Sequence, residues 1–244
     1  MRELCIACKR VNTYMLEDLN KYISADHHQI VTNFADNEYS YLLFADVTNF
    51  NCVYKLKNAF LNYFVNEFKY DFLLGKIGKR DDFLFLACVK VLALFDRETD
   101  EQFLLGDMAL SGWIYLDSYV DFRLNILKKR WQEIADLAID NNFALLDYAT
   151  MGRIMSFLIS TMPQNAHIGR IAKNEMYLFI HDGVEESFDL NDKLGVVTNL
   201  LRINPACIVY DENIDDDMKA FLDLCFAEKI KNIQNIVDKN HLTL

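Results

Sequence analysis

The stretch from Asp117 to Asn142 constrains the fold most, because it carries the clearest long amphipathic pattern in the sequence. Its apolar residues recur at helical spacing and would share one face: Leu116, Val120, Leu127, Trp131, Ile134 and Ala138. Asp117 or Ser118 can cap the start, and Asn141 and Asn142 can end it. At about 1.5 Å per residue this helix would be about 35–40 Å long, so other helices must pack along it.

Arg123 is the polar exception on this predicted apolar face. At about 100° per residue it falls within about 60° of the centre of the stripe. A guanidinium in that position has to pair with a carboxylate or extend to water. The pattern therefore predicts a buried or rim salt bridge that fixes helix packing, with anion binding as the alternative.

Before and after this stretch, helical and strand-like patterns alternate along the chain. Helices are expected at 12–24, 51–77, 83–95, 99–105, 145–162, 191–203 and 215–227. Strands are expected at 2–9, 28–34, 39–46, 166–171, 176–181, 206–210 and 229–233. The segment 111–116 fits either a helix or a short extended link. Together these elements predict an α+β fold with a helix-rich core and small β-containing modules at both ends.

The composition favours one compact chain. Hydrophobic residues make up 52% of the 244 residues, which is enough for a substantial core, and only 2 Pro and 8 Gly interrupt it. Within residues 1–244 we expect a small α/β module at 1–49 and a helical core at 50–162. A β-hairpin with further α/β elements should follow at 163–234, and a tail at 235–244.

The charge and the apolar pattern exclude several classes of function. A net charge of −11 disfavours binding to nucleic acid or to an anionic membrane surface, because both need concentrated positive charge. No apolar run reaches the roughly 20 residues of a transmembrane segment. The start of the chain also lacks the apolar core and cleavage site of a signal peptide. We therefore expect a cytosolic protein whose six cysteines are reduced.

Cys5 and Cys8 form a C-x-x-C motif, and His27 and His28 could add nitrogen ligands. A metal or redox site would need a second ligand pair, or a helix N-terminus that lowers a thiol pKa. In the strand predicted for 2–9, the two thiols point to opposite faces. Structural cysteines are therefore the leading interpretation, and a Cys/His metal or redox protein is the alternative. No cofactor is predicted.

Histidine, arginine and aspartate residues supply the candidates for an enzyme or a small-molecule binder. His167, His181 and Asp182 lie at the ends of the predicted hairpin, and Arg123 could bind an anion. No nucleophile or catalytic motif accompanies them. The aspartate-rich run 211–217 lacks the spacing, the glycine and the terminal glutamate of a calcium loop, so helix capping explains it better.

Several motifs in the second half resemble the YtxC-like family of putative sporulation proteins from endospore-forming bacteria. They are Gly112-Trp113-Ile114, Phe122-Arg123-Leu124, the stretch Trp131 to Asn142, the hairpin ending near Phe179 to His181, the helix from Val196 to Pro205, and Cys207-Ile208-Val209-Tyr210. The spacing between the first two motifs is wider here, and the family's C-terminal cysteine pair is missing. The resemblance implies a cytosolic protein of sporulating cells, and it supplies no catalytic residues.

Taken together, the sequence favours a non-enzymatic cytosolic protein with an interaction or structural role and an as yet unidentified protein partner. The enzyme or small-molecule binder and the metal or redox protein remain as alternatives. Nothing in the sequence determines an oligomeric state.

Overall fold

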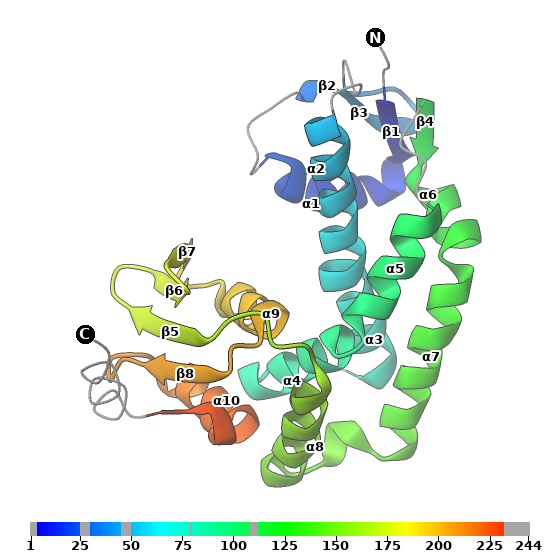
Figure 1. The fold of residues 1–244 in the computed structure, drawn as a ribbon. Coiled ribbons are helices and arrows are strands. Elements are labelled where there is room, and N and C mark those ends of the chain that lie inside the picture. The colour runs from blue at the N-terminus through cyan, green and yellow to red at the C-terminus, as the bar shows by residue number, and fades with distance from the viewer. Residues whose placement is uncertain (1–3, 25–29, 45–49, 79, 108–111, 232–244) are drawn as a thin grey trace. The chain divides into compact units, whose positions relative to one another are not determined.

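The computed structural model describes residues 4–24, 30–44, 50–78, 80–107 and 112–231. It has the expected α+β class, with a helix-rich core and two small sheets (Figure 1). The chain divides into two compact units. Unit 1 comprises residues 1–72 and 97–134, and unit 2 comprises residues 73–96 and 135–244. The segment 50–162, which the sequence pattern assigned to one helical core, contributes helices to both units.

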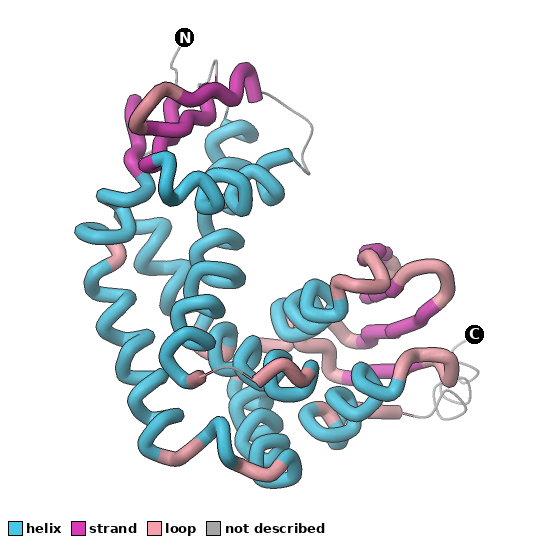
Figure 2. The backbone as a smooth tube through the Cα atoms, turned by 180° about the vertical axis from the view of Figure 1, so that it is seen from behind, coloured by secondary structure: helices cyan, strands magenta, loops and turns pink. Residues whose placement is uncertain are grey.

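The sheet of unit 1 has the strand order β2-β3-β1-β4. Its strands are β1 (Leu4–Lys9), β2 (Ile30–Ala35), β3 (Tyr39–Phe44) and β4 (Gly112–Tyr115). β1 lies in the centre, antiparallel to β3 and parallel to β4. The segment 111–116, which the sequence left open, is therefore mostly a strand. The four strands gather at one end of the unit's helices (Figure 2).

The helices of unit 1 contain two π-helical segments. α1 (Thr13–Ser24) packs against β1 and β3, and α5 (Arg97–Asp107) packs against α2. The predicted helix 51–77 is continuous, but it consists of α2 (Phe50–Leu61), a π-helical segment (Asn62–Phe68) and α3 (Lys69–Ile77). Such wide turns are uncommon, and each inserts an extra residue into the helical repeat.

The stretch Asp117–Asn142 is helical, as predicted, but it is not one uniform α-helix. It comprises α6 (Leu116–Ser118), a π-helical segment (Tyr119–Arg123) and α7 (Asn125–Asp140). The amide of Leu124 donates to the carbonyl of Tyr119 at 3.1 Å, which closes the wide turn. The predicted apolar face is buried at Leu116, Val120, Leu127, Trp131 and Ala138, and Leu124 and Ala135 join it. The left-handed conformation of Asn142 (φ 52°) follows the last turn.

Unit 2 is built around α4 (Phe83–Leu94), which is buried on nearly every side as its apolar sequence predicts. It packs against α8 (Tyr148–Thr161), α9 (Lys193–Ile203) and α10 (Asp216–Cys225). Each of these four helices begins after an aspartate whose side chain accepts a bond from a first-turn amide: Asp82, Asp147, Asp192 and Asp215. Among the described residues, no helix is both long enough and apolar enough to span a bilayer.

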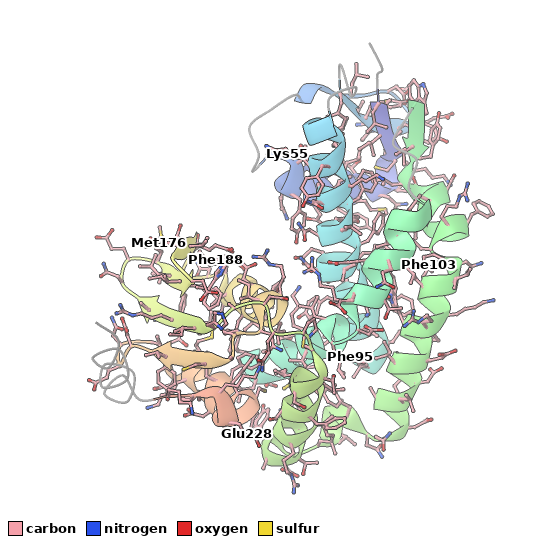
Figure 3. All side chains as sticks on the ribbon, viewed as in Figure 1. Lys55, Phe95, Phe103, Met176, Phe188 and Glu228 are labelled. Atoms are coloured by element: carbon pink, nitrogen blue, oxygen red, sulfur yellow. The ribbon has the colours of Figure 1, made fainter. Side chains whose placement is uncertain are left out.

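The sheet of unit 2 has the order β7-β6-β5-β8, and α9 covers β6 and β7. Its strands are β5 (Ile168–Lys173), β6 (Tyr177–His181), β7 (Val184–Phe188) and β8 (Cys207–Tyr210). The predicted hairpin is β5–β6. β7, which ends at Phe188 (Figure 3), was missed because its glutamates obscure the strand pattern. Of the strand expected at 229–233, Ile230 forms an isolated bridge with Ile208, and residues 232 and 233 lie outside the described part.

Asn204 joins three segments of unit 2 through a fully buried side chain. Its amide nitrogen donates to the carbonyls of Ile159, Met162 and Pro163 at 3.0–3.3 Å, and its oxygen accepts from the Lys229 ammonium at 2.5 Å. The backbone of Asn204 is left-handed (φ 44°), which suits the residue that follows α9. The end of α9 is thereby tied to the end of α8.

Gly152 marks the close approach of α8 and α10, and it yields a stability prediction. A Cβ at this position would overlap the Leu224 side chain and lie 3.0 Å from the Leu224 carbonyl oxygen. We expect Gly152→Ala to lower the free energy of unfolding by about 1–3 kcal/mol, because the helices must separate. Urea unfolding followed by circular dichroism measures it.

Gly75→Ala is the matched control, because Gly75 lies within α3 and a Cβ there meets nothing within 4 Å. It should leave stability unchanged or raise it by up to about 1 kcal/mol. Equal stability of the two variants would contradict the close approach.

Candidate functional site

The sheet of unit 1 carries aromatic side chains on the face opposite α1. On the α1 side, the hydroxyls of Thr13 and Ser40 lie 2.9 Å apart. Ser40 pairs with Cys8 across β3 and β1, so Cys8 shares that face. The other face carries Cys5 and Ala7 at its centre, because successive strand residues alternate.

Four rings surround these two small residues, and we call this surface the aromatic face: Tyr39, Tyr41, Trp113 and Tyr115. Cys5 pairs with Trp113, and Ala7 pairs with both Tyr41 and Tyr115. The small side chains of Cys5 and Ala7 leave room for the rings of the flanking strands to meet above them. Trp113 is 59% exposed and Tyr115 is 42% exposed, whereas Tyr41 is buried.

The four rings form a closed circuit of contacts. The ring centroids are 6.2 Å apart for Tyr39–Tyr41, 6.0 Å for Tyr41–Trp113, 6.2 Å for Trp113–Tyr115 and 5.7 Å for Tyr115–Tyr39. These separations are typical of rings in direct contact. The four rings therefore form one continuous aromatic surface, of which Trp113 and Tyr115 are the most exposed part.

Asp36 holds Tyr41 in place and adds a fixed negative charge beside the rings. Its Oδ2 accepts from the Tyr41 hydroxyl at 2.6 Å, and its Oδ1 accepts from the amides of Glu38 and Tyr39 at 2.8 and 2.7 Å. These bonds, the Tyr41 hydroxyl foremost, lower the pKa of Asp36. The same carboxylate raises the pKa of Tyr41 to about 12. Asp36 is therefore ionised at neutral pH.

The C-x-x-C motif does not assemble as a pair of ligands. Cys5 lies under the aromatic face, and Cys8 lies on the opposite face, where its thiol donates to the Asn12 carbonyl at 3.3 Å. Burial raises the pKa of the Cys5 thiol, and it raises that of Cys8 to about 11. His27 and His28 lie outside the described residues. Within the described part of the chain, no three His, Cys, Asp or Glu side chains gather as a metal site would require.

Arg123 is exposed, so it does not lie on the buried face where the helical pattern placed it. The reason is the π-helical segment Tyr119–Arg123, whose extra residue changes the angular position of every side chain around it. Leu124 takes the buried position, and Phe122 is 78% exposed. A salt bridge of Arg123 at the rim of the helix and anion binding by Arg123 both stay predictions.

His167, His181 and Asp182 lie near one another in unit 2, at the end of the β5–β6 hairpin. The Asp182 carboxylate accepts from the amides of His167 and Ile168 at 3.2 and 3.4 Å, which gives it a role in the turn. His181 stacks on Phe179 at 5.6 Å, and its Nε2 lies 3.4 Å from a Glu186 oxygen. These contacts hold the hairpin together. Arg123 belongs to the other unit.

Each unit also has an open pocket near its sheet, but neither pocket is lined by these candidates. The pocket in unit 1 has a volume of about 500 Å³ and lies between α1 and the β2–β3 hairpin, with Thr13, Glu17 and Asn20 among its lining residues. The pocket in unit 2 has a volume of about 700 Å³ and lies beside the end of β8.

A fully buried ion pair crosses the helical part of unit 1. The Lys69 ammonium on α3 lies 2.7 Å from Asp100 Oδ2 on α5, and both side chains have no exposed surface. The buried indole of Trp131 on α7 donates toward both Asp100 oxygens at 3.2 Å. One carboxylate thus connects three helices. With no exposed surface, it serves to hold the helices and not to bind a ligand.

The aromatic face was missed by reasoning from the sequence. The signal was present, because Tyr39-x-Tyr41 and Trp113-x-Tyr115 each place two rings two residues apart, on one side of a strand. However, the segment 111–116 fitted a helix equally well. The pairing of β4 with β1, across more than 100 residues of sequence, is a tertiary feature that local patterns do not contain.

Comparison with known proteins adds no further assignment. A scan of protein-family models, a search of curated proteins and a search of solved structures each gave no match to this chain.

The bond between Tyr41 and Asp36 predicts a specific titration. Asp36→Asn removes the carboxylate that accepts from the phenol and repels the phenolate, so the pKa of Tyr41 should fall from about 12 toward its usual value near 10. Titration of the Tyr41 ring signals by NMR measures this, with Glu38→Gln as the control that removes an adjacent exposed charge. An unchanged Tyr41 pKa in Asp36→Asn would contradict the bond.

The buried ion pair predicts a large loss of stability on removal of one partner. Asp100→Asn keeps the shape of the side chain but removes the negative charge that the buried Lys69 ammonium contacts, which should cost about 3–5 kcal/mol. Glu98→Gln on the exposed side of the same helix should change stability by less than about 0.5 kcal/mol. The fluorescence of Trp131 during urea unfolding reports on unit 1 directly, provided that Trp113 is replaced by Phe in both variants.

Proposed function

We propose that this protein is a non-enzymatic interaction protein that binds a partner protein through the aromatic face of its N-terminal sheet. The observation that supports this proposal is the exposure of Trp113 and Tyr115 on an otherwise ordered sheet face. Trp and Tyr are the residues that most often dominate protein–protein binding energy, because each buries a large apolar area and loses few rotamers.

The structural setting also supports a binding role. Central anchors in an interface are most effective when they are held in place before binding. Here each exposed ring contacts two neighbouring rings, and the underlying strand β1 is paired on both sides. Tyr41 is fixed in turn by Asp36. The face can therefore bind a partner at a low cost in conformational entropy.

The cellular setting of the proposal comes from the sequence alone. The resemblance to the YtxC-like family supports a cytosolic role in sporulating cells. Expression across sporulation, together with spore counts from a deletion strain, tests this part. Constitutive expression with normal spores would refute it and would leave the binding face untouched.

The binding role is tested by purification from the native cells with matched variants. Partners should co-purify with the wild-type chain and be lost from Trp113→Ala/Tyr115→Ala, because the two exposed anchors are gone. Tyr54→Ala is the control, since Tyr54 is 57% exposed on α2 of the same unit and lies off the sheet. Circular dichroism should confirm that all variants fold. Equal retention of partners by the double variant and the control would show that the aromatic face is not the binding surface.

A further inference from the structure

The chemistry around the aromatic face identifies what kind of partner it suits. Within the described residues, three carboxylates border the end of the sheet where β3 begins and β4 ends: Asp36, Glu38 and Asp117. The carboxylate of Asp117 is held by the amide of Lys9 at 2.7 Å, and that of Asp36 by three donors. Two cations lie at the same end. Arg10 donates to the Asp36 carbonyl at 3.1 Å, and Lys9 is exposed. These residues carry three negative and two positive charges, and Lys9 shares the face of Cys5 and Ala7.

The faces of aromatic rings also attract positive charge. The π-system of Trp or Tyr is negative at its face, so it attracts a cation that lies above it. Arginine is best suited to this, because its planar guanidinium stacks on a ring and is weakly hydrated. The net charge of −11 adds a long-range attraction for basic segments.

The edge strand β4 offers a second means of binding, through its backbone. β4 is the last strand in the order β2-β3-β1-β4, and in the described part of the chain no strand pairs with its outer side. Such an edge presents backbone groups that can accept a further strand from another chain. The ring centroids of Trp113 and Tyr115 are 6.2 Å apart. Two residues of an extended strand span about 6.6 Å, so alternate side chains of an added strand match this spacing.

We propose that the aromatic face binds an extended, arginine-bearing segment of a partner protein. The segment adds beside β4 and places arginines at alternate positions over Trp113 and Tyr115, with the bordering carboxylates balancing their charge. This inference rests on the proposed function, because it specifies the chemistry of the partner at the same face. Nucleobases would also stack on the rings, but the acidic border and the net charge oppose a phosphate backbone.

Three capped peptides test the proposal against the full-length chain. The first alternates arginine and threonine over six residues, the second has the same composition with the arginines in one block, and the third replaces arginine with neutral citrulline. The two tryptophans provide the readout by NMR, since Trp113 is exposed and Trp131 is fully buried.

The alternating peptide should shift the indole N–H signal of Trp113 and leave that of Trp131 in place. The block peptide should bind about threefold more weakly, and the citrulline peptide should not bind, because charge and spacing are both needed.

The variants assign the contact to the rings. Because these variants lack the Trp113 signal, their affinities are measured by isothermal titration calorimetry. Trp113→Ala should weaken binding of the alternating peptide about fivefold, and Trp113→Ala/Tyr115→Ala about tenfold or more, because each ring contributes a cation–π contact. These variants keep the charge of the chain, so a purely Coulombic association would survive them. Tyr54→Ala should bind as the wild type does.

The proposal is overturned if the alternating and citrulline peptides bind equally, or if the double variant keeps its affinity. It is also overturned if the sedimentation-derived mass of the wild-type chain rises with protein concentration and that of the double variant does not, since the occupant would then be a second copy of the chain. If partner retention in native cells depends on the aromatic face but no arginine peptide binds, the inference of an arginine-bearing segment is wrong and the proposed function stands. Retention that does not depend on the face refutes the proposed function itself.

Discussion

The ion pair of Lys69 and Asp100 is the interaction on which the helical part of unit 1 depends. Two opposite charges with no exposed surface have lost their hydration, and only their mutual contact and further hydrogen bonds compensate for that loss. Asp100 meets this requirement by accepting from both the Lys69 ammonium and the Trp131 indole. α3, α5 and α7 are therefore fixed in register in a way that apolar contacts alone would not enforce.

The two π-helical segments set the orientation of the helices that follow them. One, Asn62–Phe68, ends immediately before Lys69, and the other, Tyr119–Arg123, ends shortly before α7. The extra residue in each wide turn rotates the following helix, so that Lys69 and Trp131 both face Asp100. The segments also contact each other, because the rings of Phe64 and Tyr119 lie 5.3 Å apart. The same rotation places Phe122 and Arg123 on the surface. A structural requirement in the core thus determines which residues are exposed.

The aromatic face depends on the same framework. β4 leads directly into α6 and the wide turn, so the position of Trp113 and Tyr115 follows from the packing of the helix that comes after them. Their partners Tyr39 and Tyr41 come from a hairpin early in the chain. Neither pair of rings would be ordered on an isolated strand. Joined through Cys5 and Ala7, they form one continuous surface beside the edge strand β4.

The sequence by itself determined the class of the fold and the position of most helices and strands, because hydrophobic period and capping residues act over a few neighbouring residues. α4 was predicted from its apolar composition, and the β5–β6 hairpin from two strand-like segments joined by a short polar link. The π-helical segments were not predictable, because they change the residue spacing at which side chains share one face of a helix. For that reason the pattern placed Arg123 on the buried face, whereas its side chain is exposed. β4 and the aromatic face were decided only by the tertiary structure. β4 follows β3 by more than 60 residues of sequence. Both strands pair with β1, and the pairing of β4 depends on the packing of the helices that lie between β3 and β4 in the chain.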